Sequence, residues 1–292
     1  MSESLVNYKI SHEKSLLFLN QERIIGAQSI NMQQNFASTP LNYAGIGVDT
    51  VKYIPRGEQT NNFSINSYLI NKDYFLEAVT GNSLYNLYVA RDKTDFGAYF
   101  SLISGYFNSF ESSYSVGSVA EVNVNGIVVG DAGKISTGSM NSAQISDITF
   151  ISTGNHDVNT NNLKIPDIGS ITLNIDEFST NRLLSYNIRI ESNKRPIYFM
   201  GNRLPKRVEN LYPINVDCNF TFEPGDYEDR RLRNFPQSGI VKNLTVTVND
   251  YNGGGQICSY SFNNLNLISE NKETSVNGNV TINQQYNAKI MG

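Results

Sequence analysis

Strict alternation of apolar and polar residues is the feature that most constrains this chain. It runs through residues 118–125, 185–190, 215–222 and 244–249. Successive side chains of a strand point to opposite faces, so each segment predicts a strand with one buried and one wet face. Such strands usually belong to antiparallel sheets that are exposed to water on one side. We therefore expect a mainly β protein.

Turn-forming residues separate the alternating segments. Asn125-Gly126, residues 252–255 and Asn277-Gly278 all predict tight turns between strands. The 17 tyrosines and 15 phenylalanines also favour strands. With 39% hydrophobic and only 17% charged residues, the chain has enough apolar material for a core and too little charge for a disordered or coiled-coil protein.

Two segments predict short helices. Residues 71–80 have Asn71 as a candidate N-cap and are followed by Gly81. Residues 226–234 follow Pro224-Gly225, with acidic residues first and arginines last, the order that the helix dipole favours.

Similar motifs recur in the same order in the two halves of the chain, which indicates a duplication. Residues 29–39 resemble residues 170–180, and residues 114–122 resemble residues 274–282. We expect two tandem antiparallel β-sandwich or half-barrel domains, each flanked by one short helix, with long loops. The first would cover residues 1–135 and the second residues 170–292. Residues 136–169 would form a polar linker or surface excursion around a weak strand at 147–151.

A second long excursion, residues 192–210, mixes basic with aromatic residues. It is interpreted as a hairpin arm that docks on a neighbouring subunit, with a solvated loop as the alternative, because long loops usually have a function. The candidate inter-subunit contact residues are Lys194, Arg195, Tyr198, Phe199, Arg203, Lys206 and Arg207.

Little in the sequence indicates catalysis or metal binding. The two histidines are remote in sequence from the two cysteines, and no phosphate loop, nucleophile elbow or dinucleotide fingerprint occurs. Acidic residues at 176–177 and 226–229 are better explained as turn or helix N-terminal residues, and the 250–255 segment as a hairpin tip rather than a calcium loop. We expect no enzyme and no catalytic, cofactor or metal-binding residue.

Charge and hydropathy limit the partners. A net charge of −4 does not suit a protein that grips nucleic acid or an anionic membrane. No run of apolar residues has the length of an export signal or a membrane span. We therefore expect no membrane partner, and we expect Cys218 and Cys258 to stay thiols in a reducing compartment.

Residues 105–124 combine an aromatic segment, Gly105-Tyr106-Phe107, with Tyr114-Ser115-Val116-Gly117 and an alternating valine segment, 119–124. This combination resembles a signature of bacteriophage tail tube (major tail) proteins. If the duplication is real, the resemblance covers both halves of the chain. It implies a virion protein, assembled in the host cytoplasm, whose copies pair sheet edges into rings that stack into a DNA-conducting tube.

Further expectations follow from the resemblance. A duplicated chain would form a pseudo-sixfold ring from three copies, and the loops at 38–62 and 192–210 would contact neighbouring copies or rings. DNA would pass through the lumen transiently and without sequence specificity, so Lys206 and Arg207 should face a partner subunit rather than the lumen. Other tail proteins would be further partners.

Alternative interpretations remain open. The chain could be another ring-forming tail protein, such as a distal-tail, baseplate or terminator subunit, which would form rings without tubes. A carbohydrate-binding or adhesive β-sandwich is a second alternative, and a glycosidase a third.

Overall fold

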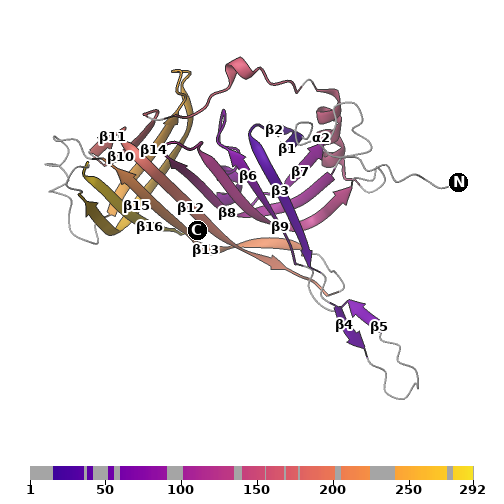
Figure 1. Cartoon of the computed structure of the whole chain (residues 1–292). Helices are drawn as coiled ribbons and strands as arrows, with labels where there is room; N and C mark the ends of the chain where they lie inside the picture. Colours follow the sequence, from indigo (N-terminus) through magenta and orange to yellow (C-terminus); the bar gives the residue numbers. More distant parts are fainter. Residues whose placement is uncertain are drawn as a thin grey trace. The chain divides into compact units, whose positions relative to one another are not determined.

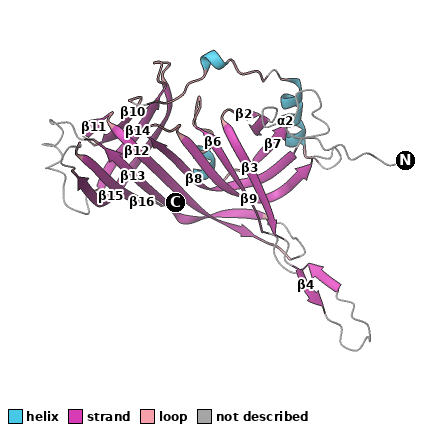
Figure 2. Cartoon of the chain, in the orientation of Figure 1, coloured by secondary structure: helices cyan, strands magenta, loops and turns pink. Residues whose placement is uncertain are grey.

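The computed structural model describes residues 16–35, 38–41, 52–55, 60–90, 101–134, 140–154, 156–167, 169–176, 178–200, 205–223, 241–274 and 279–291. Strands dominate this part of the chain (Figure 2). The strands are β1 (Leu16–Leu19), β2 (Glu22–Ile24), β3 (Ala27–Asn35), β4 (Ser38–Leu41), β5 (Lys52–Pro55), β6 (Thr60–Tyr68), β7 (Tyr85–Ala90), β8 (Ser101–Ser115), β9 (Glu121–Lys134), β10 (Ile171–Ile175), β11 (Phe178–Thr180), β12 (Leu183–Ile197), β13 (Arg207–Phe222), β14 (Val241–Asn249), β15 (Gln256–Glu273) and β16 (Thr281–Ile290). The helical elements are α1 (Leu76–Thr80), α2 (Ser142–Thr153) and the short 3₁₀ turn η2 (Thr160–Asn162).

The chain forms two compact units that are interleaved along the sequence. Unit 1 comprises residues 1–24, 84–105 and 130–158, and unit 2 comprises residues 25–83, 106–129 and 159–292. Strands β8 and β9 contribute residues to both units. Unit 2 thus takes residues from both predicted halves, and the division into tandem domains at 1–135 and 170–292 stays a prediction.

Unit 2 is built on an antiparallel sheet in the order β11-β10-β14-β15-β16-β13-β12-β8-β9-β6-β3 (Figure 1). Every predicted alternating segment contributes to one of its strands. Strand β15 changes partners along its length, because residues 256–266 pair with β14 whereas residues 266–273 pair with β16. Register shifts near Leu244 and Ser269 accompany this change. Such irregularities bend a sheet and allow it to turn a corner.

The bend brings distant strands together across an aromatic core. The Tyr260 ring on β15 lies 5.9 Å from the Phe110 ring on β8 and 6.5 Å from the Tyr186 ring on β12. In sheet order, β16 and β13 separate β15 from β12. The inner faces of these strands therefore face each other.

The segment before α1 enters this core. Asp73 Oδ1 accepts hydrogen bonds from the backbone N–H groups of Phe75, at 2.8 Å, and Leu76, at 3.2 Å. Its other oxygen accepts a hydrogen bond from the Tyr260 hydroxyl, at 2.8 Å. Burial raises the pKa of Asp73, and the three hydrogen bonds oppose that shift.

Unit 1 contains the order β2-β1-β7-β8 and helix α2. Ile151 of α2 is buried in a cluster with Leu16, Phe18 and Tyr88. The Tyr88 hydroxyl donates a hydrogen bond to Asp147 Oδ2 of the helix, at 2.8 Å. Among the described residues, no helix has the length and apolar character needed to cross a membrane.

Two sequence-based predictions about helices need correction. Helix α1 begins at Leu76 instead of Asn71, because Asp73 satisfies its first N–H groups whereas the Asn71 side chain accepts a hydrogen bond from Lys164 N–H. The strand predicted at 147–151 is wrong, because these residues belong to α2, which begins at a capping box formed by Asn141 and Gln144. The predicted helix at 226–234 lies outside the described residues.

The turn predicted at Asn125-Gly126 is also wrong. Strand β9 runs straight through both residues, which pair with Ser64 and Phe63 of β6. A Cβ atom at position 126 would overlap the Phe63 ring and crowd the Tyr106 carbonyl. Gly126 is therefore a packing glycine within a strand. The turn predicted at 252–255 is confirmed between β14 and β15, and the turn at 277–278 lies outside the described residues.

We predict that Tyr260→Phe lowers the free energy of unfolding by about 1–3 kcal/mol, because the buried Asp73 carboxyl loses a hydrogen-bond donor. Urea unfolding of the unassembled protein measures this free energy. Tyr251→Phe is the matched control, since Tyr251 is 57% exposed and its change should stay within about 0.5 kcal/mol. Equal stability of the two variants would contradict the role given to Tyr260.

The raised pKa of Asp73 predicts a pH dependence with a definite sign. The folded protein retains the Asp73 proton at a pH where the unfolded chain loses it, so stability falls as pH rises above about 4. The unfolding free energy of the native protein should therefore fall relative to that of Asp73→Asn over this pH range.

Asp176→Asn provides the control of opposite sign. Burial tends to raise the pKa of Asp176, but the ion pair with Lys242, at 2.8 Å, and the Asn243 N–H hold that pKa below its ordinary value. The native protein should therefore lose stability relative to Asp176→Asn as pH falls below about 4. Parallel pH profiles for the two variants would contradict the assignment.

Candidate functional site

One face of the unit 2 sheet is almost entirely polar. The register places Asn187, Ser113 and Asn219 side by side on neighbouring strands, and Arg189 lies between Glu111 and Asp217. Directly paired residues project from the same side of a sheet. We call this surface the polar face; its members are Ser29, Asn31 and Gln33 on β3, Asn62, Ser64 and Asn66 on β6, Glu121, Asn123 and Asn125 on β9, Ser109, Glu111 and Ser113 on β8, Asn187, Arg189 and Glu191 on β12, Asn215, Asp217, Asn219 and Thr221 on β13, and Asn283, Gln285, Asn287 and Lys289 on β16.

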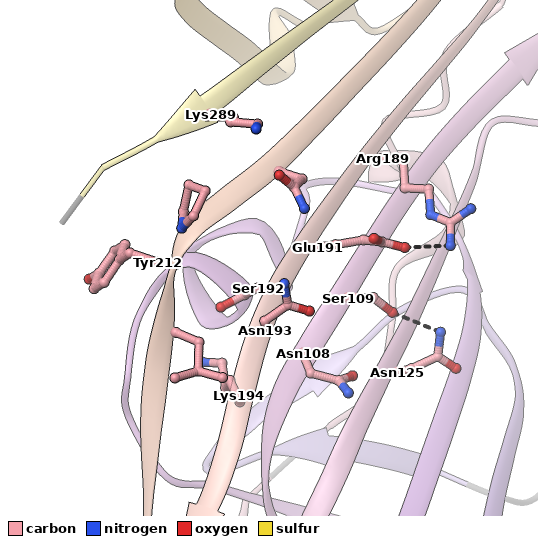
Figure 3. Close-up of a pocket in the computed structure, with 13 residues that line it drawn as sticks. Asn108, Ser109, Asn125, Arg189, Glu191, Ser192, Asn193, Lys194, Tyr212 and Lys289 are labelled. Atoms are coloured by element: carbon pink, nitrogen blue, oxygen red, sulfur yellow. Dashed lines mark hydrogen bonds and ion pairs between the residues drawn. The ribbon is translucent and has the colours of Figure 1, made fainter.

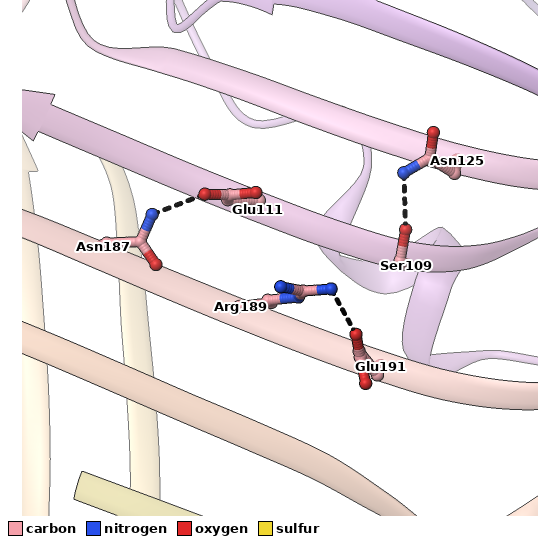
Figure 4. Close-up of polar contacts among 6 residues, drawn as sticks. All are labelled: Ser109, Glu111, Asn125, Asn187, Arg189 and Glu191. Carbon is pink, nitrogen blue, oxygen red and sulfur yellow. Dashed lines mark hydrogen bonds and ion pairs between the residues drawn. The ribbon is translucent and has the colours of Figure 1, made fainter. Parts of the chain in front are cut away.

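Hydrogen bonds tie the polar face together (Figure 4). The Asn125 amide donates to Ser109 Oγ at 2.8 Å, and the Asn187 amide donates to Glu111 Oε1 at 2.6 Å. Arg189 and Glu191 form an ion pair at 2.5 Å, with side chains 55% and 39% exposed. The face therefore presents mostly amides and hydroxyls, and its arginine is already engaged by a carboxylate.

The charge balance of the polar face is slightly negative. Its four carboxylates and two cations give it a formal charge of −2. Polyanions bind proteins mainly through lysine and arginine contacts that release counterions. This polar face can be hydrated and can contact a polyanion, but it has few cations with which to bind one.

A groove of about 800 Å³ lies on unit 2 where the register between β12 and β13 shifts (Figure 3). Between Glu191 and Asn193 of β12, the pairing on β13 moves from Asn215 to Leu211. Ser192 Oγ and Asn108 Oδ1 line this groove as buried atoms without a hydrogen-bond partner within the described structure. The shift thus interrupts both the backbone ladder and the polar network.

Strand β3 leaves a long sheet edge open. It pairs with β6 on one side, and no described strand pairs with its other side. Its nine residues contain no charge and no proline, the usual devices that protect an edge from pairing with another chain. None of its side chains with a described burial is buried. The opposite edge of the unit 2 sheet ends at β11, which has three residues.

Beyond the groove, β12 and β13 continue as a two-stranded arm. Asn193–Ile197 pairs with Arg207–Leu211, and we call residues 193–211 the hairpin arm. Within the predicted excursion at 192–210, residues 193–197 and 207–210 thus form paired strands instead of a solvated loop. Exposed apolar side chains gather on or beside the arm: Phe199 (50% exposed), Met200 (104%), Leu211 (45%) and Tyr212 (52%).

Six of the seven predicted contact residues divide into three groups. Arg195, Phe199, Lys206 and Arg207 are exposed on the arm, and Arg207 also forms an ion pair with Glu209 at 2.7 Å. Tyr198 is half-buried and takes part in an interaction within the chain, and Arg203 lies outside the described residues.

Lys194 has an environment that differs from those of the other contact candidates. Only 8% of it is exposed, and its amine donates a hydrogen bond to the Gly81 carbonyl. Burial lowers the pKa of Lys194 to about 8. Its charge therefore interacts within the chain.

The sequence pattern predicted the hairpin but not the β3 edge or the polar face. The uncharged run from Ala27 to Asn35 was a usable signal for that edge.

The other residues considered for catalysis or metal binding, His156 and the two cysteines, pack within the structure. His156 contacts the Ile151 carbonyl at 2.8 Å and packs against Phe18, with ring centroids 4.9 Å apart. Cys218 and Cys258 are free thiols, and burial raises the pKa of both, to about 12 for Cys258. Within the described ranges, no group of three or more histidine, cysteine, aspartate or glutamate side chains is placed to hold a metal ion.

The chain matches no protein-family model and no curated protein.

We predict that adding two lysines to the polar face, by Ser109→Lys and Asn125→Lys, strengthens binding to duplex DNA. Two new phosphate contacts should steepen the slope of log affinity against log salt concentration by about 1.8. Fluorescence anisotropy of a labelled duplex at several salt concentrations measures this slope. The charge-neutral pair Ser109→Thr and Asn125→Gln is the control. An unchanged slope in the lysine variant would show that the face is inaccessible to DNA.

Proposed function

We propose that this chain is a structural virion protein of a bacteriophage tail tube, whose copies form rings that stack into a conduit for DNA. The observation that carries the proposal is the combination of an open, unprotected β3 edge with a polar face that continues up to that edge. Pairing of β3 with a neighbouring copy extends the sheet and its polar face together. Repetition around a ring satisfies every open edge, as closure does in a barrel.

The segment that resembles tail tube proteins contributes residues to the polar face. Residues 105–124 form most of β8, the turn after it and the start of β9. This hairpin supplies Ser109, Glu111, Ser113 and Asn123 to the polar face, and Phe107, Phe110 and Val122 to the core. The residues behind the resemblance therefore belong to the surface that the proposal uses.

The polar face suits the inner wall of a DNA channel. A lumen must allow DNA to slide, so it needs hydration without strong attraction to phosphates. A face rich in amides and hydroxyls, with a formal charge of −2, meets that requirement. The exposed basic residues of the hairpin arm would then contact a neighbouring copy or ring.

Symmetry and stacking follow from the same proposal. A ring uses a heterologous contact around its axis, and stacking of rings uses a second heterologous contact that propagates into a filament. If the chain is duplicated, three copies would form a pseudo-sixfold ring. The virion tail would be the site of function, after assembly in the host cytoplasm with other tail proteins.

We predict that the purified protein forms hollow tubes or rings in negative-stain electron microscopy, and that Asn31→Lys with Gln33→Lys prevents this. Lysines on an edge strand oppose pairing with another chain. Both side chains are exposed, so the free energy of unfolding of the variant should lie within about 0.5 kcal/mol of the native value.

The matched control carries Asn31→Gln and Gln33→Asn, which leave the edge uncharged, and it should assemble normally. Dispersed monomers of the native protein would contradict the proposal, as would normal assembly of the lysine variant. Rings that never stack would instead favour another ring-forming tail protein, such as a distal-tail, baseplate or terminator subunit.

A further inference from the structure

The hairpin arm is fastened to unit 2 at one short turn. Gly81 follows the last residue of α1, and its carbonyl accepts a hydrogen bond from the Lys194 amine on β12. The neighbouring Asn82 side chain donates a hydrogen bond to the Val208 carbonyl on β13, at 3.4 Å. Both strands of the arm are therefore held by adjacent residues of one turn.

Lys194 is the stronger of these two attachments. Its side chain is buried, and its amine lies 5.8 Å from the centre of the Tyr106 ring, so a cation–π contact adds to the hydrogen bond. The carbonyl that it contacts lies just beyond the C-terminal end of a helix, where a cation is favoured. With a pKa of about 8, the amine is mostly protonated at pH 7.

The arm needs such an attachment because its connection to the sheet is interrupted. The β12–β13 register shifts between Glu191 and Asn193, directly before the arm. Ser192 Oγ, at that position, is buried without a hydrogen-bond partner in the described structure. A register shift bends a two-stranded ribbon and weakens its ladder, so the ladder alone does not fix the direction of the arm.

We propose that Lys194, with Asn82 as a second attachment, is the positioning residue that holds the hairpin arm in the direction required for docking on a second copy of this chain. The docking part rests on the proposed function. Lys194 acts within its own chain, while Phe199, Met200 and the exposed basic residues of the arm contact the neighbouring copy. An arm fixed before docking loses less conformational freedom on docking, which increases affinity without any new contact.

The first test measures the arm in dispersed protein by amide hydrogen exchange. Lys194→Met keeps an apolar stem of similar length and removes the amine. Exchange at residues 193–197 and 207–211 should become at least about tenfold faster, since a hydrogen bond from a charged donor is lost. Exchange in β14 should stay unchanged, which shows that the fold is intact.

Three further variants make this result specific. Arg195→Met is the matched control, because Arg195 is the next residue on the same strand and its side chain is exposed. Lys194→Arg should restore slow exchange, because a guanidinium can donate to the Gly81 carbonyl. Asn82→Ala removes the second attachment from an exposed position, so it gives a reading even if Lys194→Met fails to fold. Equal arm exchange in Asn82→Ala, Lys194→Met and Arg195→Met would overturn the proposal.

The second test measures the lowest protein concentration at which tubes or rings form. It should rise about ten- to a hundredfold in Lys194→Met and return toward the native value in Lys194→Arg. A released arm with an unchanged assembly concentration would overturn the docking part. If the native protein does not assemble at all, the proposed function fails while the exchange experiment still decides the role of Lys194.

Discussion

The structure of unit 2 depends on burial of one aromatic layer between two parts of the same sheet. Tyr260 on β15 meets Phe110 and Tyr186 only because the sheet turns a corner where β15 exchanges β14 for β16 as its partner. Aromatic rings bury large apolar areas, so this contact stabilises the corner of the sheet. The same closure also buries Asp73, whose ionised form is disfavoured there. Three hydrogen bonds to its oxygens make that burial tolerable and fix the start of α1 against the sheet.

Closure on one side of the sheet determines what the other side can do. With the aromatic residues committed to the core, strict alternation directs the intervening asparagines, serines and charged residues to the opposite face. A sheet with a single wet face still leaves backbone donors and acceptors at its outer strands. At β11 this edge is three residues long, whereas at β3 it extends over nine uncharged residues. Of these two edges, β3 is the longer and has no protecting charge, so pairing there would extend the polar face beyond a single copy.

The local sequence pattern predicted the strands well, but it did not predict which distant segments pack against them. The alternation in residues 215–222 and 244–249 is a property of each strand, so β13 and β14 could be read directly from the sequence. Gly126 was mistaken for a turn residue because its real constraint, the Phe63 ring on β6, comes from a strand far away in sequence. Helix α2 was missed because its serines, threonines and isoleucines have modest helix propensity, and only the Asn141–Gln144 capping box marked its start. The polar face required the register between strands, which composition does not contain.

Lys194 shows why a charge pattern alone does not identify a contact residue. It belongs to a basic segment, and its neighbour Arg195 is exposed, but alternation along β12 turns the two side chains to opposite faces. The inward position removes the amine from water, a cost that a buried cation recovers only through well-placed partners. The Gly81 carbonyl and the Tyr106 ring supply those partners. A buried charge of this kind specifies one arrangement, because the amine loses its partners if β12 moves relative to Gly81 and Tyr106. The lysine therefore serves the arm best by defining its direction, while the exposed residues on the arm remain available to another molecule.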